Sequence, residues 1–197
     1  QTPDSAGTST AIHSGFKTKS GLIGLSNSSK RGDCTSEKKE LESIMDVFKQ
    51  LGKSVGLVTN TRVTHATPAA VYAHSFDRNW EDDSKVPEDC LQDDIALQLI
   101  NSNIDLVLGG GRRHFLPIEV LNQKGKRKDS RNLIEEFKTN GGVFLNDNND
   151  FKNYNIDSDK RLIGLFSDSH FPYLAEKENK PSLLELSNLA IEYLNKN

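Results

Sequence analysis

Four short apolar runs constrain the fold of this chain most, because none of them alternates polar and apolar residues as a half-exposed strand does. They are "GLIGLS" (21–26), "SVGLVTN" (54–60), "IDLVLGGG" (104–111) and "RLIGLF" (161–166). Such runs are typical of strands that are buried on both faces. With helices between them, they predict an α/β fold: a three-layer sandwich around a central, mostly parallel sheet. Active sites in such sheets gather at the carboxyl ends of the strands.

Segments with apolar residues at helical spacing separate these runs. We expect helices at 8–14, 36–52, 67–74, 91–102, 131–142 and 181–197, and a short further strand at 143–146. Ser36 is the expected N-cap of the second helix and Gly52 its stop. The polar segment 145–160 is expected to be a loop. No repeat or linker divides the chain, so residues 1–197 are expected to be part of a single α/β domain, and an incomplete part of its sheet.

Length and charge exclude some classes of protein. A chain of 197 residues can bury a sizeable core. Its net charge of −3 argues against nucleic-acid binding, which needs a concentrated basic face. The one dense basic run, "KGKRKDSR" (124–131), is interpreted as a solvated loop. No apolar run approaches the roughly 18 residues that a membrane span requires.

The two cysteines, Cys34 and Cys90, lie in polar surroundings, "RGDCTSE" and "PEDCLQD". They could be free core thiols, but these surroundings favour one disulfide, and therefore an oxidising compartment. The triplet that begins at Asn27 is an acceptor sequence for N-glycosylation, which fits that compartment. Such triplets also arise often by chance.

The stretch "TPDSAGTSTA" (2–11) holds the first candidate for chemistry, Ser5. Its neighbours are small and leave the hydroxyl uncrowded. A helix that begins near Ser5 would direct free backbone N–H groups at an anion on the serine. However, Asp4 and Ser5 before a helix are also good caps, and the local sequence alone favours capping. The G-x-S-x-G signature of a nucleophile elbow is absent.

The second candidate is "TRVTHATPAAVYAHSFDRNW" (61–80), which places His65, Thr67, His74 and Arg78 in one short segment after a predicted strand. The planar fork of an arginine matches two phosphate oxygens. A threonine hydroxyl suits a hard ion such as magnesium. The glycine run at 108–115 lacks the Gly-Lys-Ser/Thr ending of a P-loop, and we interpret it as a tight turn.

Four motifs together resemble the animal-type branch of the alkaline phosphatases, in the same order and over essentially the whole chain. They are "TPDSAGTSTA", "VGLVTNTRVTHATPAAVYAHSFDRNW", "IDLVLGGGRRHFLP" and "LIGLFSDSHFPY". The resemblance implies hydrolysis of phosphate monoesters through a phosphoserine, with two zinc ions and one magnesium ion. It implies that Ser5 is the zinc-bound nucleophile, that Asp4 is its acidic neighbour in the substrate site and that Arg78 clamps the phosphate.

The same resemblance assigns roles to four more residues. Thr67 matches the hydroxyl ligand of the magnesium, and His65 matches a histidine near the magnesium and the phosphate. Cys34 and Cys90 match a disulfide pair of animal-type members. The resemblance therefore strengthens the expectation of a disulfide.

Two departures from the family pattern qualify the resemblance. Ser167 and Lys180 stand where two acids of a calcium site are expected, and Asp168 could replace only one of them, so we expect no calcium site. None of the five histidines lies in an H-x-x-x-H or D-H pattern, so the zinc ligands are expected outside this chain. The 197 residues alone are therefore expected to be inactive.

The resemblance implies that the chain is the central fragment of an extracellular, periplasmic or cell-surface enzyme, commonly a homodimer. A membrane anchor could follow Asn197. Two alternatives stay open: a non-catalytic phosphate-binding module, and a metal-free serine esterase that uses His65 or His74 as its base.

Overall fold

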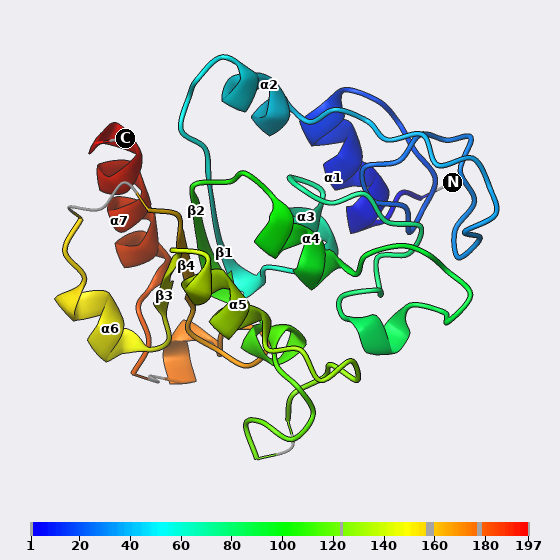
Figure 1. Cartoon of the computed structure of the whole chain (residues 1–197). Helices are drawn as coiled ribbons and strands as arrows, with labels where there is room; N and C mark the ends of the chain where they lie inside the picture. The colour runs from blue at the N-terminus through cyan, green and yellow to red at the C-terminus, as the bar shows by residue number, and fades with distance from the viewer. Residues whose placement is uncertain (1, 123, 157–159, 177–178, 197) are drawn as a thin grey trace.

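A computed structural model describes residues 2–122, 124–156, 160–176 and 179–196. Its sheet, in the part of the chain described, has four strands in the order β1-β2-β4-β3, and all three ladders are parallel (Figure 1). The strands are β1 (Gly56–Arg62), β2 (Leu106–Gly110), β3 (Val143–Leu145) and β4 (Leu162–Leu165). The predicted parallel sheet is confirmed, and its central strands β2 and β4 are fully buried.

Helices cover both faces of the sheet, as the absence of alternation predicted. On one face α7 (Leu183–Lys196) buries Leu186, Ala190 and Tyr193 against Leu106 and Leu108 of β2. On the other face α4 (Ile95–Asn101) and α5 (Leu133–Thr139) pack against Val107. Successive residues of β2 thus enter different cores, so the three-layer α/β sandwich is confirmed.

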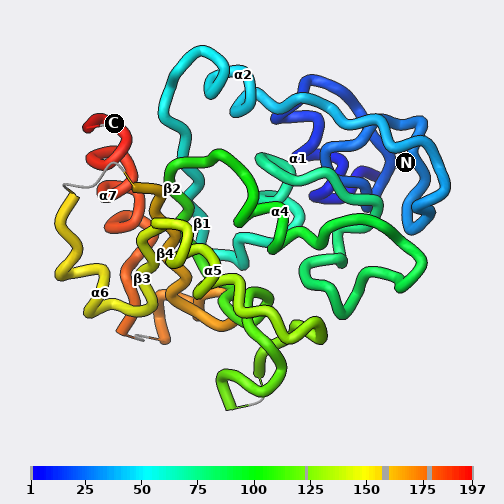
Figure 2. Tube along the Cα trace, viewed as in Figure 1, coloured from blue at the N-terminus to red at the C-terminus, as the bar shows by residue number. Residues whose placement is uncertain are grey.

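Apart from β1, most of the first half of the chain lies beside the sheet and carries three more helices (Figures 1 and 2). They are α1 (Ser5–Ser14), α2 (Ile44–Gln50) and α3 (Ala66–Ala69). Single 3₁₀ turns lie at Asp83–Lys85, Arg112–Phe115 and Leu174–Glu176. The N-terminal and C-terminal segments lie on opposite sides of the molecule in this view (Figure 2).

The strand predicted at 21–26 is wrong. Gly21 and Gly24 adopt positive φ angles of 84° and 60°, which interrupt an extended strand. Ile23 and Leu25 instead form isolated antiparallel bridges with Ser75 and Glu40, and both side chains are fully buried. The run is apolar because Leu22, Ile23 and Leu25 pack into two small hydrophobic clusters of the N-terminal half.

The helix predicted over 36–52 is wrong in its first half. Ser43 is the N-cap of α2, and its side chain and that of Asp46 form a capping box. Ser36 instead closes a turn, since its hydroxyl accepts a hydrogen bond from the Lys30 N–H at 3.0 Å. Gly52 follows the end of α2 with a φ of 70°, as expected of a helix stop.

The loop predicted at 145–160 contains a helix, α6 (Asn148–Asn153). Asp147 caps it by accepting hydrogen bonds from the N–H groups of Asn149 and Asp150. Phe151 of α6 packs edge-on against Phe166, with ring centroids 5.9 Å apart. One aromatic contact and one cap stabilise a helix that lacks an apolar stripe, which explains why periodicity missed it. Residues 157–159 of the predicted loop lie outside the described residues.

Cys34 and Cys90 form a disulfide, with their Cα atoms 5.6 Å apart. The bond joins two loops of the N-terminal half and packs near Leu25, Phe76 and Trp80. The disulfide prediction is confirmed. Among the described helices, none combines the length and the hydropathy that crossing a membrane requires.

Candidate functional site

Ser5 is the first residue of α1, and Asp4 caps that helix. Asp4 Oδ1 accepts a hydrogen bond from the Gly7 N–H at 3.0 Å, and Asp4 Oδ2 accepts one from the Gly21 N–H, also at 3.0 Å. The carboxylate therefore fixes both the start of α1 and the turn at Gly21. Ser5 is held at the positive end of the helix dipole, where an anion is favoured.

Arg78 brings together two segments that are far apart in the sequence, 2–11 and 61–80. Its Nη1 lies 3.1 Å from Asp4 Oδ2 and 3.1 Å from Ser5 Oγ. Its Nη2 donates to His65 Nε2 at 3.3 Å. The Arg78 side chain is 19% exposed, so the guanidinium is largely shielded but still reachable from solvent. The predicted residues Asp4, Ser5, His65 and Arg78 therefore form one hydrogen-bonded group, which we call the Arg78 group.

Local structure explains why these side chains meet. His65 follows β1 and is the N-cap residue of α3, so it lies at the carboxyl edge of the sheet. The Ser9 hydroxyl donates to the Thr67 carbonyl at 2.7 Å and ties α1 to α3. The Arg78 N–H donates to the Gly21 carbonyl at 2.9 Å, which anchors the arginine to the turn that Asp4 also holds.

Thr67 lies in α3, two residues after His65, and is exposed. In the part of the chain described, the hydrogen bonds of the Arg78 group do not include the Thr67 hydroxyl. His74 lies apart from Ser5: its Nε2 is 3.1 Å from the Leu41 carbonyl oxygen. The geometry therefore gives no support to His74 as a base for Ser5.

The charges of the group are set by its surroundings. Burial raises the pKa of Asp4, but hydrogen bonds from Gly7 and Gly21 and the Arg78 guanidinium outweigh this and leave the pKa below its usual value. Burial, helped by the nearby cation of Arg62, lowers the pKa of His65. At neutral pH Asp4 is therefore a carboxylate and His65 is neutral. Its Nε2 accepts from Arg78, so Nδ1 carries the proton.

A second polar cluster, which the sequence did not indicate, lies directly behind His65. Glu81 is its centre: its carboxylate accepts hydrogen bonds from Arg62 at 2.7 and 2.8 Å and from the Thr64 hydroxyl at 2.6 Å. Burial raises the pKa of Glu81, but Arg62, His114 and Thr64 together lower it to about 2. Arg62 also contacts His170, whose ring lies 5.2 Å from that of His65.

The described residues do not form a zinc site. Within the described ranges no three His, Cys, Asp or Glu side chains cluster so as to hold a metal ion. His65 and Thr67 could offer an imidazole and a hydroxyl, which is only part of a ligand set. Asp168, the acid considered for a calcium site, is bound by Arg112 at 2.7 Å. The Ser167 hydroxyl donates to the His170 carbonyl at 3.0 Å.

The fold and the site together define a three-layer α/β protein with a serine and an arginine at one anion-favouring helix end. The family model described as alkaline phosphatase matches residues 1–197. The chain is 39% identical to an alkaline phosphatase of Gadus morhua and 37% identical to the tissue-nonspecific isozyme of Homo sapiens. These alignments cover 100% of this chain, but 46% and 42% of those proteins.

Solved structures agree with this match. The alkaline phosphatase of Thermus thermophilus superposes with a TM-score of 0.76 at 29% identity, over 98% of this chain and 35% of that one. A variant of the enzyme from the bacterium TAB5, solved with magnesium bound in its M3 site, gives a TM-score of 0.74 at 27% identity, over 99% of this chain and 47% of that one. The chain belongs to the alkaline phosphatase family. It spans less than half the length of the curated relatives it matches.

Proposed function

We propose that the enzyme containing these residues hydrolyses phosphate monoesters through a phosphoserine intermediate on Ser5. One observation carries the proposal: Arg78 Nη1 lies 3.1 Å from Ser5 Oγ. A guanidinium at that distance can bind two non-bridging oxygens of a phosphate that is being transferred to the serine. Membership of the alkaline phosphatase family supports the same reaction.

The residues divide the work as follows. Ser5 Oγ attacks phosphorus, the bond from phosphorus to the ester oxygen breaks, and the leaving alcohol takes up a proton. Water then cleaves the phosphoserine and releases phosphate. Arg78 offsets the charge on the equatorial oxygens, and the N–H groups at the start of α1 favour the anion. Asp4 holds Arg78 in place, and neutral His65 lies beside the phosphate.

The cofactors of the complete enzyme are part of the proposal: two zinc ions and one magnesium ion. Zinc at Ser5 would favour the alkoxide form of its hydroxyl. Thr67 would supply a hydroxyl ligand to magnesium, with His65 near that ion. The magnesium bound in a variant of the TAB5 relative supports a magnesium cofactor. No calcium site is proposed, because Arg112 already pairs with Asp168 and Ser167 lacks a carboxylate.

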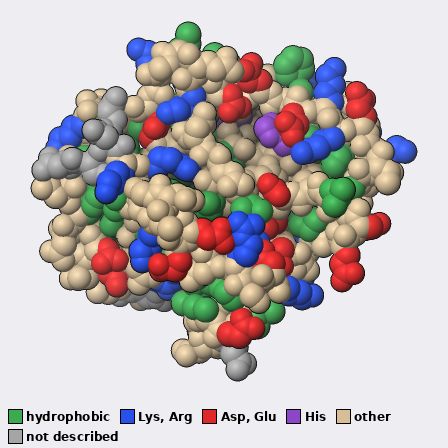
Figure 3. Space-filling model, in the orientation of Figure 1, with side chains coloured by type: hydrophobic (Ala, Val, Ile, Leu, Met, Phe, Trp, Pro, Cys, Tyr) green, Lys and Arg blue, Asp and Glu red, His purple; other side chains and the backbone are tan. Residues whose placement is uncertain are grey.

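The cellular setting is also a proposal. The Cys34–Cys90 disulfide supports an extracellular, periplasmic or cell-surface location, because such bonds persist in oxidising compartments. Asn27 is exposed and is proposed as a glycosylation site. The complete enzyme is proposed to be a homodimer. Basic and acidic side chains are interspersed on the face seen in Figure 3, in keeping with a small phosphate ester rather than nucleic acid as its partner.

Hydrolysis of a chromogenic phosphate monoester, with zinc and magnesium added, tests the proposal. In the complete enzyme we expect Ser5→Ala to lower kcat by at least about a thousandfold. We expect the 197 residues alone to be no faster than their own Ser5→Ala variant, because their metal ligands are too few. Full activity of the Ser5→Ala enzyme would overturn the role of Ser5. If the 197 residues alone hydrolyse the substrate and their Ser5→Ala variant does not, the expectation that this fragment is inactive is wrong.

A further inference from the structure

A cavity of about 780 Å³ opens beside the candidate site, between segment 79–85 and the loop that follows β2. Four of its lining residues are cationic: Lys85, Arg113, Lys126 and Lys128. They come from three separate stretches of the chain and converge on one space. The proposed phosphoserine chemistry uses none of them.

Two of the lining residues connect the cavity to the Arg78 group. Asn79, which lines it, directly follows Arg78 in the chain. Glu81 also lines it, and the carboxylate of Glu81 accepts the hydrogen bond from Thr64, the residue before His65. The segment that begins at Arg78 thus continues directly into the lining of the cavity.

The backbone that carries two of the lysines is anchored rather than loose. The Lys126 N–H donates to the carbonyls of Arg113 at 2.9 Å and Leu116 at 3.1 Å. The Lys128 N–H donates to Asp83 Oδ2 at 2.9 Å. The residue between them, Arg127, is 1% exposed.

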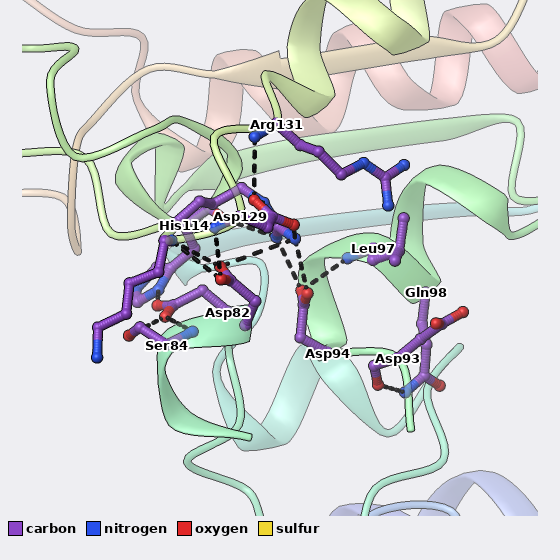
Figure 4. A network of polar contacts seen from close by, with 12 residues as sticks. Asp82, Ser84, Asp93, Asp94, Leu97, Gln98, His114, Asp129 and Arg131 are labelled. Atoms are coloured by element: carbon purple, nitrogen blue, oxygen red, sulfur yellow. Dashed lines mark hydrogen bonds and ion pairs between the residues drawn. The ribbon is translucent and has the colours of Figure 1, made fainter. Parts of the chain in front are cut away.

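Arg127 pairs with Asp94 at 2.9 Å and with Asp129 at 2.5 Å. Asp94 and Asp129 lie close together in the polar network of Figure 4. The solvated loop predicted for this basic run is therefore wrong at Arg127. The buried arginine presents the exposed Lys126 and Lys128 on either side of it. An anchored backbone reduces the entropy that these lysines would lose on binding a ligand.

The charge of the cavity is not balanced by its own acids. Of the two acids that line it, Glu81 is paired with Arg62 at 2.7 Å, and Asp82 is bonded to His114 at 2.6 Å. Across the described ranges, no ion pair joins any of the four cations to an acid. Four positive charges around one open cavity favour a multivalent anion.

We propose that this cavity is a second anion site, separate from Arg78, for compact anions that carry several phosphate groups. Lysine ammonium groups on anchored backbone and the Arg113 guanidinium would hold the phosphate oxygens. An orthophosphate ion has too few charges to engage the whole rim, so the site discriminates in favour of polyphosphorylated anions. Their binding should weaken as salt rises, because the rim is open to solvent.

Calorimetric titration of the full chain with inorganic triphosphate, at low and at physiological salt, tests the site. We expect K126Q/K128Q to weaken triphosphate binding by about tenfold or more, since it removes two of the four charges. The matched control is K39Q/K53Q, which removes two exposed lysines that do not line the cavity. This control should change the affinity by less than about twofold, as expected of remote screened charges.

A third variant, Arg78→Ala, separates this inference from the proposed function. Triphosphate binding that survives Arg78→Ala and falls in K126Q/K128Q supports the second site, whether or not Arg78 handles substrate phosphate. Equal losses in K126Q/K128Q and in the lysine control would overturn the inference. So would triphosphate binding that depends on Arg78 and not on the two lysines.

Discussion

Asp4 has two roles, one in capping α1 and one in holding Arg78. Different substitutions at this position can separate these roles. One carboxylate oxygen caps α1 through Gly7, and the other accepts from Gly21 and Arg78. An asparagine at this position keeps a cap oxygen but loses the negative charge. An alanine loses both.

We therefore predict different costs for the two substitutions. Asp4→Ala should lower the free energy of unfolding by about 1–2 kcal/mol, the usual effect of losing a helix cap. Asp4→Asn should lower it by about half as much, because the ion pair with Arg78 is partly solvent-screened. Urea denaturation at pH 7 measures both values. Equal losses in the two variants would show that α1 depends on the charge and not on the cap.

The lowered pKa of Glu81 predicts that the free energy of unfolding depends on pH. Its pKa is about 2 in the folded chain and 4.5 when unperturbed, so the unfolded state binds more protons between these values. The stabilisation is complete above pH 4.5 and is lost as the pH falls toward 2. The shift corresponds to about 3 kcal/mol. The free energy of unfolding, measured by urea denaturation at several pH values between 6 and 2.5, should therefore fall more steeply with decreasing pH in the wild type than in Glu81→Gln. The same pH dependence in both proteins would contradict the prediction.

The site could be predicted from the sequence only where a local motif carried it. Ser5 and Arg78 stand in motifs that resemble a known family, and the structure places them 3.1 Å apart. Glu81 stands in no such motif, and His170 stands in the last of the four motifs without a role assigned to it. They reach His65 only because β1, segment 79–85 and the loop after β4 meet at one edge of the sheet, which no local pattern encodes.

At the scale of elements, the buried strands were predictable because burial on both faces leaves an uninterrupted apolar run. The same logic failed at 21–26, where an equally apolar run is buried without pairing into a sheet. Hydropathy reports burial, and only long-range pairing decides between a strand and an irregular segment. The prediction for α6 was wrong in the opposite way: a loop was expected where a helix forms. In α6 a cap and one aromatic contact replace an apolar stripe.

Arg127, which is buried, is predicted to have a large effect on the stability of the chain. Arg127→Met leaves Asp94 buried and uncompensated, although burial already raises the pKa of Asp94. We expect this substitution to cost about 3–5 kcal/mol of stability. Adding Asp94→Asn should recover part of the loss, because asparagine still caps α4. Urea denaturation at pH 7 compares the single and the double variant, and a double variant no more stable than Arg127→Met would contradict this account.

At the scale of the whole molecule, the chain combines a sheet with large cores on both faces and an N-terminal region with smaller cores. The sheet is covered by α4 and α5 on one face and by α7 on the other. The region that carries Ser5 and Arg78 relies instead on two small clusters and the disulfide. The reactive residues therefore lie in the part of the molecule with less buried apolar packing.

This difference predicts what loss of the disulfide will do. Cys34 and Cys90 are 56 residues apart in sequence, and a cross-link of that length is worth about 4 kcal/mol in the chain-entropy description. Because Arg78 lies inside that loop, Cys34→Ser/Cys90→Ser should loosen the site before the sheet. Hydrogen exchange followed by mass spectrometry should show faster exchange in 21–36 and 76–90, with β2 and β4 still protected. Faster exchange by the same factor throughout would instead mean that the N-terminal half and the sheet unfold as one cooperative unit, with the disulfide stabilising both equally.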